Sequence, residues 1–174
     1  IDTHNNHPSI VMWVIFNEGW GQSDTTYWAN WLQAYDPTRL VNSASGWNDM
    51  QVGDVYDIHS YPGPDAPPRS TDRASILGEF GGLGLPVEGH MWEDDFWGYR
   101  GYDDPEALLE AYSDLIVKLR DLIQTQGLAA SIYTQTTDVE SEVNGMMTYD
   151  REVIKMDWEQ IHSVNSELYQ IETP

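Results

Sequence analysis

The chain has 174 residues, 40 % of them hydrophobic, which is enough for one domain with a sizeable core. Its 29 acidic and 8 basic side chains give a formal charge of −21, which repels nucleic-acid phosphates and anionic lipid headgroups. We therefore expect neither nucleic acid nor a membrane as a partner, and no segment approaches the ~18 consecutive apolar residues of a membrane span. The chain has no cysteine, which excludes disulfides and thiolate chemistry and leaves the cellular compartment open.

Five strands are predicted from short apolar segments. The first covers residues 10–16 (IVMWVIF), ends at Asn17-Glu18, and is apolar enough to be buried on both faces. The other four are predicted over residues 39–42, 55–59, 75–78 and 128–133, each followed by a polar loop containing glycine or proline.

Three helices are predicted between and after these strands. Aromatic residues recur at helical spacing over 24–35, before Asp36-Pro37 ends that helix. The clearest helix covers 105–126 and stops at Gly127, with an apolar stripe of Leu108, Tyr112, Leu115, Leu119 and Leu122. The third is predicted over 151–169, with Ile154, Trp158, Ile161 and Leu168 facing inward.

The alternation of strands and helices predicts an α/β fold with a parallel sheet, whose active groups gather at the carboxyl ends of strands. The polar residues at or near those ends are Asn17, Glu18, Asn42, Trp47, His59, Tyr61, Glu79, Gln135 and Asp138. Glycosidic hydrolysis needs one proton donor and one nucleophile or base, and two glutamates fit these tasks. The 8 tryptophans and 10 tyrosines add flat surfaces on which sugars stack. Together these features indicate a carbohydrate substrate.

Four strings in this order carry a family resemblance: NHPSIVMWVIFNEGWG, DVYDIHSYPGP, ILGEFGG and YTQTTDVESEVNGMMTYDR. They resemble the catalytic domain of glycoside hydrolase family 2, which contains β-galactosidases, β-glucuronidases and β-mannosidases. The resemblance implies a partial (β/α)8 TIM barrel, with strands four to eight and their helices in residues 1–174. Under this interpretation the chain is the C-terminal portion of a catalytic barrel, without the earlier strands and the β-sandwich domains.

The same resemblance implies roles for individual residues in a retaining double displacement. Glu18 matches the acid/base and Glu79 the nucleophile, which predicts carboxyl groups about 5–5.5 Å apart. Asn17 matches the residue that binds the sugar 2-hydroxyl, and Tyr61 is the best candidate donor to Glu79. No cofactor and no metal are implied.

Other aromatic and acidic residues have two interpretations. Trp47, His59, Trp92 and Tyr133 are candidate sugar contacts, yet His59 is as readily a structural histidine, and tryptophans such as Trp20 are as readily packing residues. Asp138, Glu140 and Glu142 favour a hydrogen-bonded loop over a cation site, because calcium loops add glycine and further oxygen ligands.

The substrate class follows from a departure from the family pattern. Members that take uronic acids place Asn-x-Lys near the sugar carboxylate, whereas this chain reads Asn144-Gly145-Met146. We therefore predict a β-linked neutral sugar, galactose first, in an oligosaccharide or glycoside.

Two rival functions remain at this point. One is a non-catalytic carbohydrate-binding or scaffold fragment, and the other is a metal-dependent hydrolase that uses His59, His90 and the acidic loops. A fragment of a barrel would also leave the strands at 10–16 and 128–133 open to pairing. We therefore expect it to be completed by the missing half of the barrel or to form a homo-oligomer, and to lack appreciable activity alone.

Overall fold

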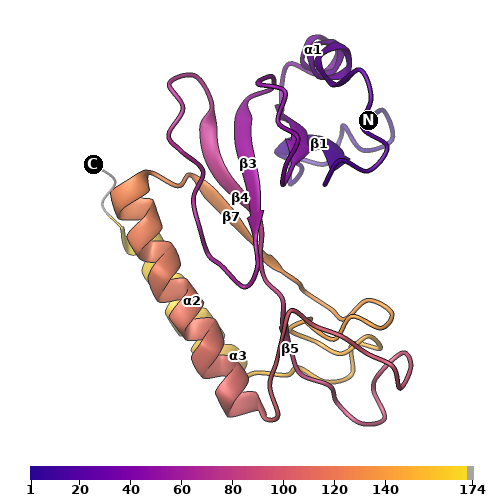
Figure 1. Ribbon diagram of the computed structural model, residues 1–174, viewed down its shortest axis with the longest axis vertical. Coiled ribbons are helices and arrows are strands. Elements are labelled where there is room, and N and C mark those ends of the chain that lie inside the picture. The colour runs from indigo at the N-terminus through magenta and orange to yellow at the C-terminus, as the bar shows by residue number, and fades with distance from the viewer. Residues whose placement is uncertain (172–174) are drawn as a thin grey trace. The chain divides into compact units, whose positions relative to one another are not determined.

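The computed structural model describes residues 1–171, which form two compact units. The first unit contains residues 1–59, 66–78 and 128–130, and the second contains 60–65, 79–127 and 131 onward. In chain order the elements are β1 (Met12–Asn17), α1 (Thr25–Tyr35), β2 (Leu40–Ser45), β3 (Val55–Ser60), β4 (Ala74–Gly81), β5 (Leu83–Gly84), β6 (Arg100–Gly101), α2 (Pro105–Gln126), β7 (Ala130–Thr134), α3 (Trp158–Ser166) and the 3-10 helix η1 (Glu167–Gln170) (Figure 1). The predicted α/β class is confirmed, and the very short strands β5 and β6 were not predicted.

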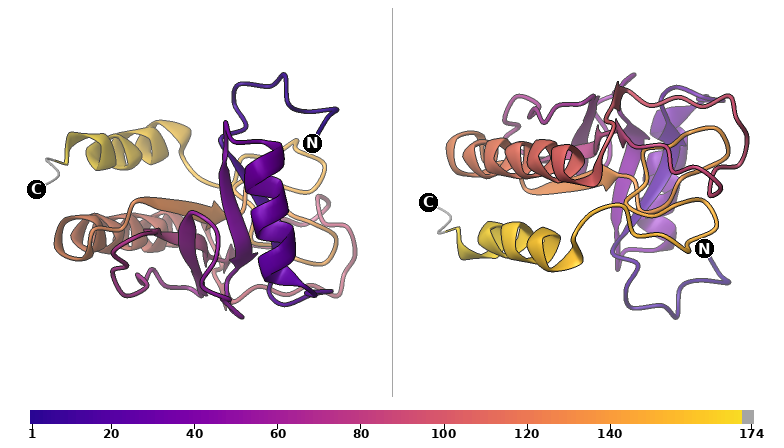
Figure 2. Two further views of the ribbon diagram at one scale, coloured as in Figure 1. Left: turned by 90° about the horizontal axis from the view of Figure 1, so that it is seen from above. Right: turned by 90° about the horizontal axis from the view of Figure 1, so that it is seen from below.

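The first unit is built on the parallel pair β1 and β2, with Met12 opposite Leu40 and Asn17 opposite Ser45. Helix α1 lies beside this pair, as the left view of Figure 2 shows. Its residues Ala29 and Leu32 form a small core with Val41 of β2. The strand–helix–strand order therefore comes from one apolar helix face that is buried against two parallel strands.

Strand β1 is not buried on both faces, as its apolar sequence had predicted. Val14 is 51 % exposed, and Val11 just before the strand is 69 % exposed. Within the described residues, β2 is the strand neighbour of β1. An apolar run shows that a strand can be buried, but burial on both faces also requires other segments packed against each face of the sheet.

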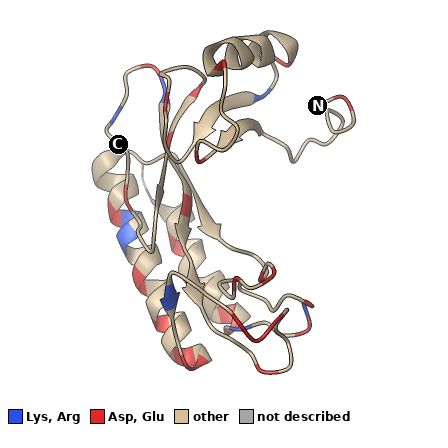
Figure 3. Cartoon of the chain, turned by 45° about the vertical axis from the view of Figure 1, so that its right-hand side comes forward, with Lys and Arg blue, Asp and Glu red and all other residues tan. Residues whose placement is uncertain are grey.

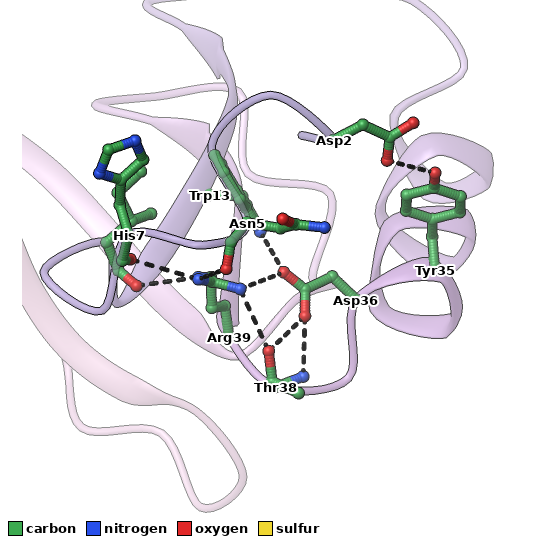
Figure 4. Close-up of polar contacts among 9 residues, drawn as sticks. Asp2, Asn5, His7, Trp13, Tyr35, Asp36, Thr38 and Arg39 are labelled. Atoms are coloured by element: carbon green, nitrogen blue, oxygen red, sulfur yellow. Dashed lines mark hydrogen bonds and ion pairs between the residues drawn. The ribbon is translucent and has the colours of Figure 1, made fainter.

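A polar cluster holds the N-terminal segment against the rest of the first unit (Figure 4). The Arg39 guanidinium forms an ion pair with Asp36 at 2.9 Å and donates to the backbone carbonyls of Asn5, His7 and Ile10. Asp36 also accepts hydrogen bonds from Thr38 and from Trp13 Nε1, which hold the pKa of its carboxyl well below the usual range. The cluster directly follows α1. This helix ends at Tyr35, just before Asp36-Pro37, so its predicted end is confirmed.

The remaining strands form a three-stranded sheet in the order β3-β4-β7 and a short parallel pair, β5 and β6. In the described chain β1–β2 and β3–β4–β7 are therefore separate sheets. Asp54 joins β2 to the start of β3, because its N–H donates to Val41 O at 2.8 Å and its carboxylate accepts from Val41 N at 2.7 Å.

The second unit places α2 and α3 side by side (Figure 2). Helix α2 has the predicted bounds, is capped by the Asp104 side chain, and ends at Gly127 in the left-handed conformation. Four of the five predicted stripe residues are buried: Leu108, Tyr112, Leu115 and Leu119. The Tyr112 hydroxyl donates to Asn165 Oδ1 of α3 at 2.8 Å.

The predicted helix over 151–169 is wrong in its first part. Helix α3 begins at Trp158, where Asp157 caps it by accepting from Gln160 N. Ile161 is buried as expected, whereas Ile154 and Trp158 are 51 % and 58 % exposed. The residues before Asp157 are irregular, and they bury Lys155 instead of forming another helical turn.

Acidic side chains occur throughout both units, and basic ones are few (Figure 3). Among residues 1–171, no helix combines the length and the apolar character that crossing a membrane requires.

Candidate active site

The two candidate catalytic glutamates lie at the ends of strands in different units. Glu18 directly follows β1 in the first unit, and Glu79 lies near the end of β4 in the second. The predicted separation of their carboxyl groups stays a prediction.

Glu18 is held by its backbone and by an imidazole. It has a left-handed backbone with φ 54°, and its N–H donates to Ser45 O at 2.9 Å. Its Oε1 lies 2.8 Å from His59 Nδ1. The Trp47 indole donates to Glu18 O at 2.9 Å. The Glu18 side chain is 22 % exposed while His59 is 1 % exposed, so the carboxyl is accessible and its partner is not.

His59 connects Glu18 to two buried polar residues, Ser45 and Asp57. Its Nε2 lies 2.7 Å from Ser45 Oγ, and the Ser45 hydroxyl donates to Asp57 Oδ2 at 2.6 Å. Gly46 leaves room for the imidazole, because a Cβ there would stand 2.8 Å from His59 Nδ1. The Trp47 ring packs against the imidazole edge-on at 5.8 Å.

Asp57 is a buried carboxylate surrounded by donors. Besides Ser45, it accepts from Asn42 Nδ2 at 2.6 Å and from Gly78 N at 2.6 Å. Burial raises the pKa of Asp57, and these three donors act in the opposite direction. A Cβ on Gly78 would lie 2.3 Å from Asp57 Oδ2, so the close backbone approach needs glycine at this position.

In the second unit, Tyr61 provides the predicted contact to Glu79. Its hydroxyl donates to Glu79 Oε2 and also lies 3.0 Å from Thr134 Oγ1. Burial and the hydrogen bond to Glu79 raise the pKa of Tyr61 far above its usual value. The Tyr61 ring stacks on Tyr99 with a centroid separation of 3.8 Å and an angle of 2°, so both ends of the phenol are fixed.

A glycine makes this stack possible. Gly82 has φ +65°, and a Cβ there would lie 2.3 Å from the Tyr99 ring and 3.0 Å from that of Tyr61. The exposed ring of Trp97 meets Tyr99 edge-on at 5.3 Å. An aromatic wall of Tyr61, Tyr99 and Trp97 therefore begins at Glu79.

The other candidate sugar contacts have mixed surroundings. Asn17 is exposed at the end of β1, and Trp92 is 54 % exposed and packs edge-on against Tyr149. Tyr133 instead packs against Phe80 and Tyr112, and burial raises its pKa. The contacts of Tyr133 are those of a packing residue, and its predicted sugar contact stays a prediction.

The acidic loop at residues 138–142 is hydrogen-bonded, as its sequence favoured. Asp138 pairs with Lys155 at 2.6 Å, with side chains 1 % and 0 % exposed, and it also accepts from Gly145 N at 2.7 Å. Glu142 accepts from Asn144 Nδ2 at 2.7 Å.

A histidine–carboxylate cluster lies elsewhere in the second unit. The ligand atoms of His90, Asp150 and Glu152 lie within 4.8 Å of one another, which could admit a cation. His90 Nδ1 lies 2.8 Å from Asp150 Oδ2, within hydrogen-bond distance.

Sequence reasoning missed Ser45, Asp57, Thr134 and Tyr99. One usable signal was present in VYDIH, because Asp57 and His59 lie two residues apart and so point to the same face of a strand. Nothing local indicated Tyr99, which is 38 residues from the tyrosine on which it stacks (99 − 61).

The N-terminal part of the chain matches a known protein family. Residues 1–66 match the model described as "Glycosyl hydrolases family 2, TIM barrel domain". A search of curated proteins found no match for the chain. The matched residues include Glu18, His59 and Tyr61, whereas Glu79 lies beyond them. The resemblance to glycoside hydrolase family 2 is therefore confirmed over residues 1–66, and this match supports a glycoside hydrolase type of function.

Proposed function

We propose that the protein is a retaining glycoside hydrolase for β-linked neutral sugars, similar to β-galactosidases, with Glu18 as acid/base and Glu79 as nucleophile. In this proposal β1, β2, β3, β4 and β7 correspond to strands four to eight of a (β/α)8 barrel. The observation that carries the proposal is the bond from the Tyr61 hydroxyl to Glu79 Oε2. A hydrogen-bond donor on one carboxylate oxygen orients the group that would attack an anomeric carbon.

The first half-reaction uses both glutamates. Glu79 attacks the anomeric carbon and forms a covalent glycosyl ester while the glycosidic C–O bond breaks. Protonated Glu18 transfers its proton to the departing oxygen. The partial exposure of Glu18 is compatible with this transfer, because the leaving group must reach its carboxyl.

The second half-reaction reverses the role of Glu18. Its carboxylate takes a proton from water, and the hydroxide oxygen attacks the anomeric carbon and releases Glu79. Two inversions give net retention, and Glu18 regains the proton that it lost.

The neutral-sugar specificity rests on the surroundings of Asn144. This residue is fully buried, and it bonds with Gln135 and with the Glu142 carboxylate. The nearby Lys155 is committed to the buried Asp138. A carboxylate on the sugar would meet acidic groups here, so we expect hydrolysis of nitrophenyl β-galactoside to exceed that of the β-glucuronide.

Azide rescue tests the two roles. Glu79→Gly should abolish turnover of nitrophenyl β-galactoside, and added azide should then yield the glycosyl azide of inverted configuration. Glu18→Ala with azide should yield the azide of retained configuration, because Glu79 still forms the glycosyl-enzyme. Glu140→Gly, at an exposed acidic loop position, is the matched control and should leave turnover unchanged.

Inverted azide from Glu18→Ala would reverse the assignment. Sugar binding without any hydrolysis by the unaltered protein would favour the non-catalytic interpretation instead.

A further inference from the structure

The network behind Glu18 is the hydrogen-bonded chain of Asp57, Ser45 and His59. It determines which of these groups carry protons. Asp57 accepts three hydrogen bonds, from Asn42, Ser45 and Gly78, and an ionised carboxylate has acceptors only. The single hydroxyl proton of Ser45 is therefore used in the bond to Asp57. At its 2.7 Å contact with His59 Nε2, Ser45 Oγ can only accept, so Nε2 must carry a proton.

This conclusion restricts the contact between His59 and Glu18. If the imidazole is neutral, its Nδ1 is bare and must accept from a protonated Glu18. If the imidazole is charged, Nδ1 donates to an ionised Glu18. In both cases one proton lies between Nδ1 and Oε1, which are 2.8 Å apart. The other neutral tautomer, with a bare Nε2, would place two acceptors against each other at Ser45.

We propose that Asp57 and Ser45 are positioning residues that fix the Nε2-protonated form of His59, so that His59 Nδ1 and Glu18 Oε1 hold one proton between them. The catalytic use of that proton rests on the proposed function, in which Glu18 gives it to the leaving group.

The arrangement suits both half-reactions. Before the first step, the shared proton is available on Glu18. After Glu18 has transferred it, the carboxylate faces a bare Nδ1 at hydrogen-bond distance, and two acceptors repel each other. Abstraction of a proton from water restores the bond, which favours the general-base step. The imidazole itself is 1 % exposed and is therefore shielded from direct exchange with solvent, whereas the Glu18 carboxyl is accessible.

The tautomer can be measured without any catalysis. Long-range ¹H–¹⁵N spectra of histidine-labelled protein distinguish a protonated ring nitrogen from a bare one, and His59→Gln identifies the signals of His59. We expect a protonated Nε2 at every pH at which the protein is folded. Ser45→Ala should allow the Nδ1-protonated tautomer to appear, and Ser45→Thr, which keeps the hydroxyl, should restore the original spectrum.

Ser43→Ala is the matched control. Ser43 is also buried on β2, but its hydroxyl donates to Val52 O at 2.9 Å, so its removal should leave the His59 spectrum unchanged. A bare Nε2 in the unaltered protein, or an unchanged spectrum in Ser45→Ala, would overturn the proposal.

Kinetics provide a second readout. Loss of a positioned acid matters most for poor leaving groups, so Ser45→Ala should lower kcat/KM about tenfold or more for alkyl β-galactosides. For dinitrophenyl β-galactoside, whose leaving group needs no proton, we expect a change below about threefold. Equal losses for both substrates would contradict the link to Glu18. Because the spectra do not depend on turnover, failure of the proposed function would be seen separately from failure of this inference.

Discussion

Replacement of Lys155 by methionine should destabilise the second unit strongly. The Lys155 ammonium lies 2.6 Å from Asp138 Oδ1 and 3.0 Å from Val143 O, and both side chains of the pair are shielded from water. Methionine keeps much of the side-chain volume but leaves the Asp138 carboxylate buried without its cation. Removing one member of a buried ion pair costs about 3–5 kcal/mol.

Protonation of Asp138 limits this loss. Burial raises the pKa of Asp138 and lowers that of Lys155, because both groups are taken out of water. Neutralising an aspartate of ordinary pKa at pH 7 costs about 4 kcal/mol, at about 1.4 kcal/mol per pH unit. We therefore expect a loss of about 3–4 kcal/mol at pH 7.

The loss should also depend on pH. A carboxyl whose folded pKa is raised above its unfolded value destabilises the fold above the unfolded pKa, and the penalty shrinks as pH falls towards that value. At pH 5 the loss in Lys155→Met should therefore be no more than about 1.5 kcal/mol.

Urea unfolding followed by tryptophan fluorescence at both pH values measures this effect. The double variant Lys155→Met with Asp138→Asn should recover most of the loss, because the neutral amide can still accept from Gly145. Arg120→Met is the matched control, since its ion pair with Glu167 is about half exposed, and it should cost less than about 1 kcal/mol. A loss below about 1 kcal/mol for Lys155→Met at pH 7, or equal losses at both pH values, would refute the reasoning.

Three further changes test other parts of the second unit. Asp104→Ala removes the cap that accepts from Ala107 N at 2.8 Å and should cost about 1 kcal/mol in urea unfolding, whereas Asp104→Asn should cost much less. Leu119→Ala, at a position 1 % exposed, should cost about 2–5 kcal/mol, and a smaller loss would mean that the α2 core repacks. The hydrogen bond from Thr148 contributes most to lowering the pKa of Asp150, which is about 2. Thr148→Val removes this bond, so the pKa of Asp150 in a carboxyl NMR titration should rise towards about 3.9. An unchanged Asp150 titration would show that His90 and the backbone are sufficient.

Local features were readable from the sequence because their physical causes are local. The Asp36-Pro37 stop and the Gly127 terminus each act within one turn of a helix, and both helix ends are where the sequence placed them. Apolar segments likewise predicted the five longer strands and the α/β class. The contact of Tyr61 with Glu79 was expected only through the family resemblance, since 18 residues separate the two (79 − 61).

The network behind Glu18 was decided by the tertiary structure. Ser45 ends β2, while Asp57 and His59 lie on β3, and their contact depends on how two strands from different parts of the chain are placed. The same holds for the exposed Val14, since an apolar strand cannot specify whether another segment will pack on its second face. Near α3, helical periodicity predicted a helix that begins at residue 151. Burial of Lys155 against Asp138 and capping by Asp157 instead make the helix begin at Trp158. In each case the sequence determined which residues could interact, and the packing of distant segments selected the contacts that formed.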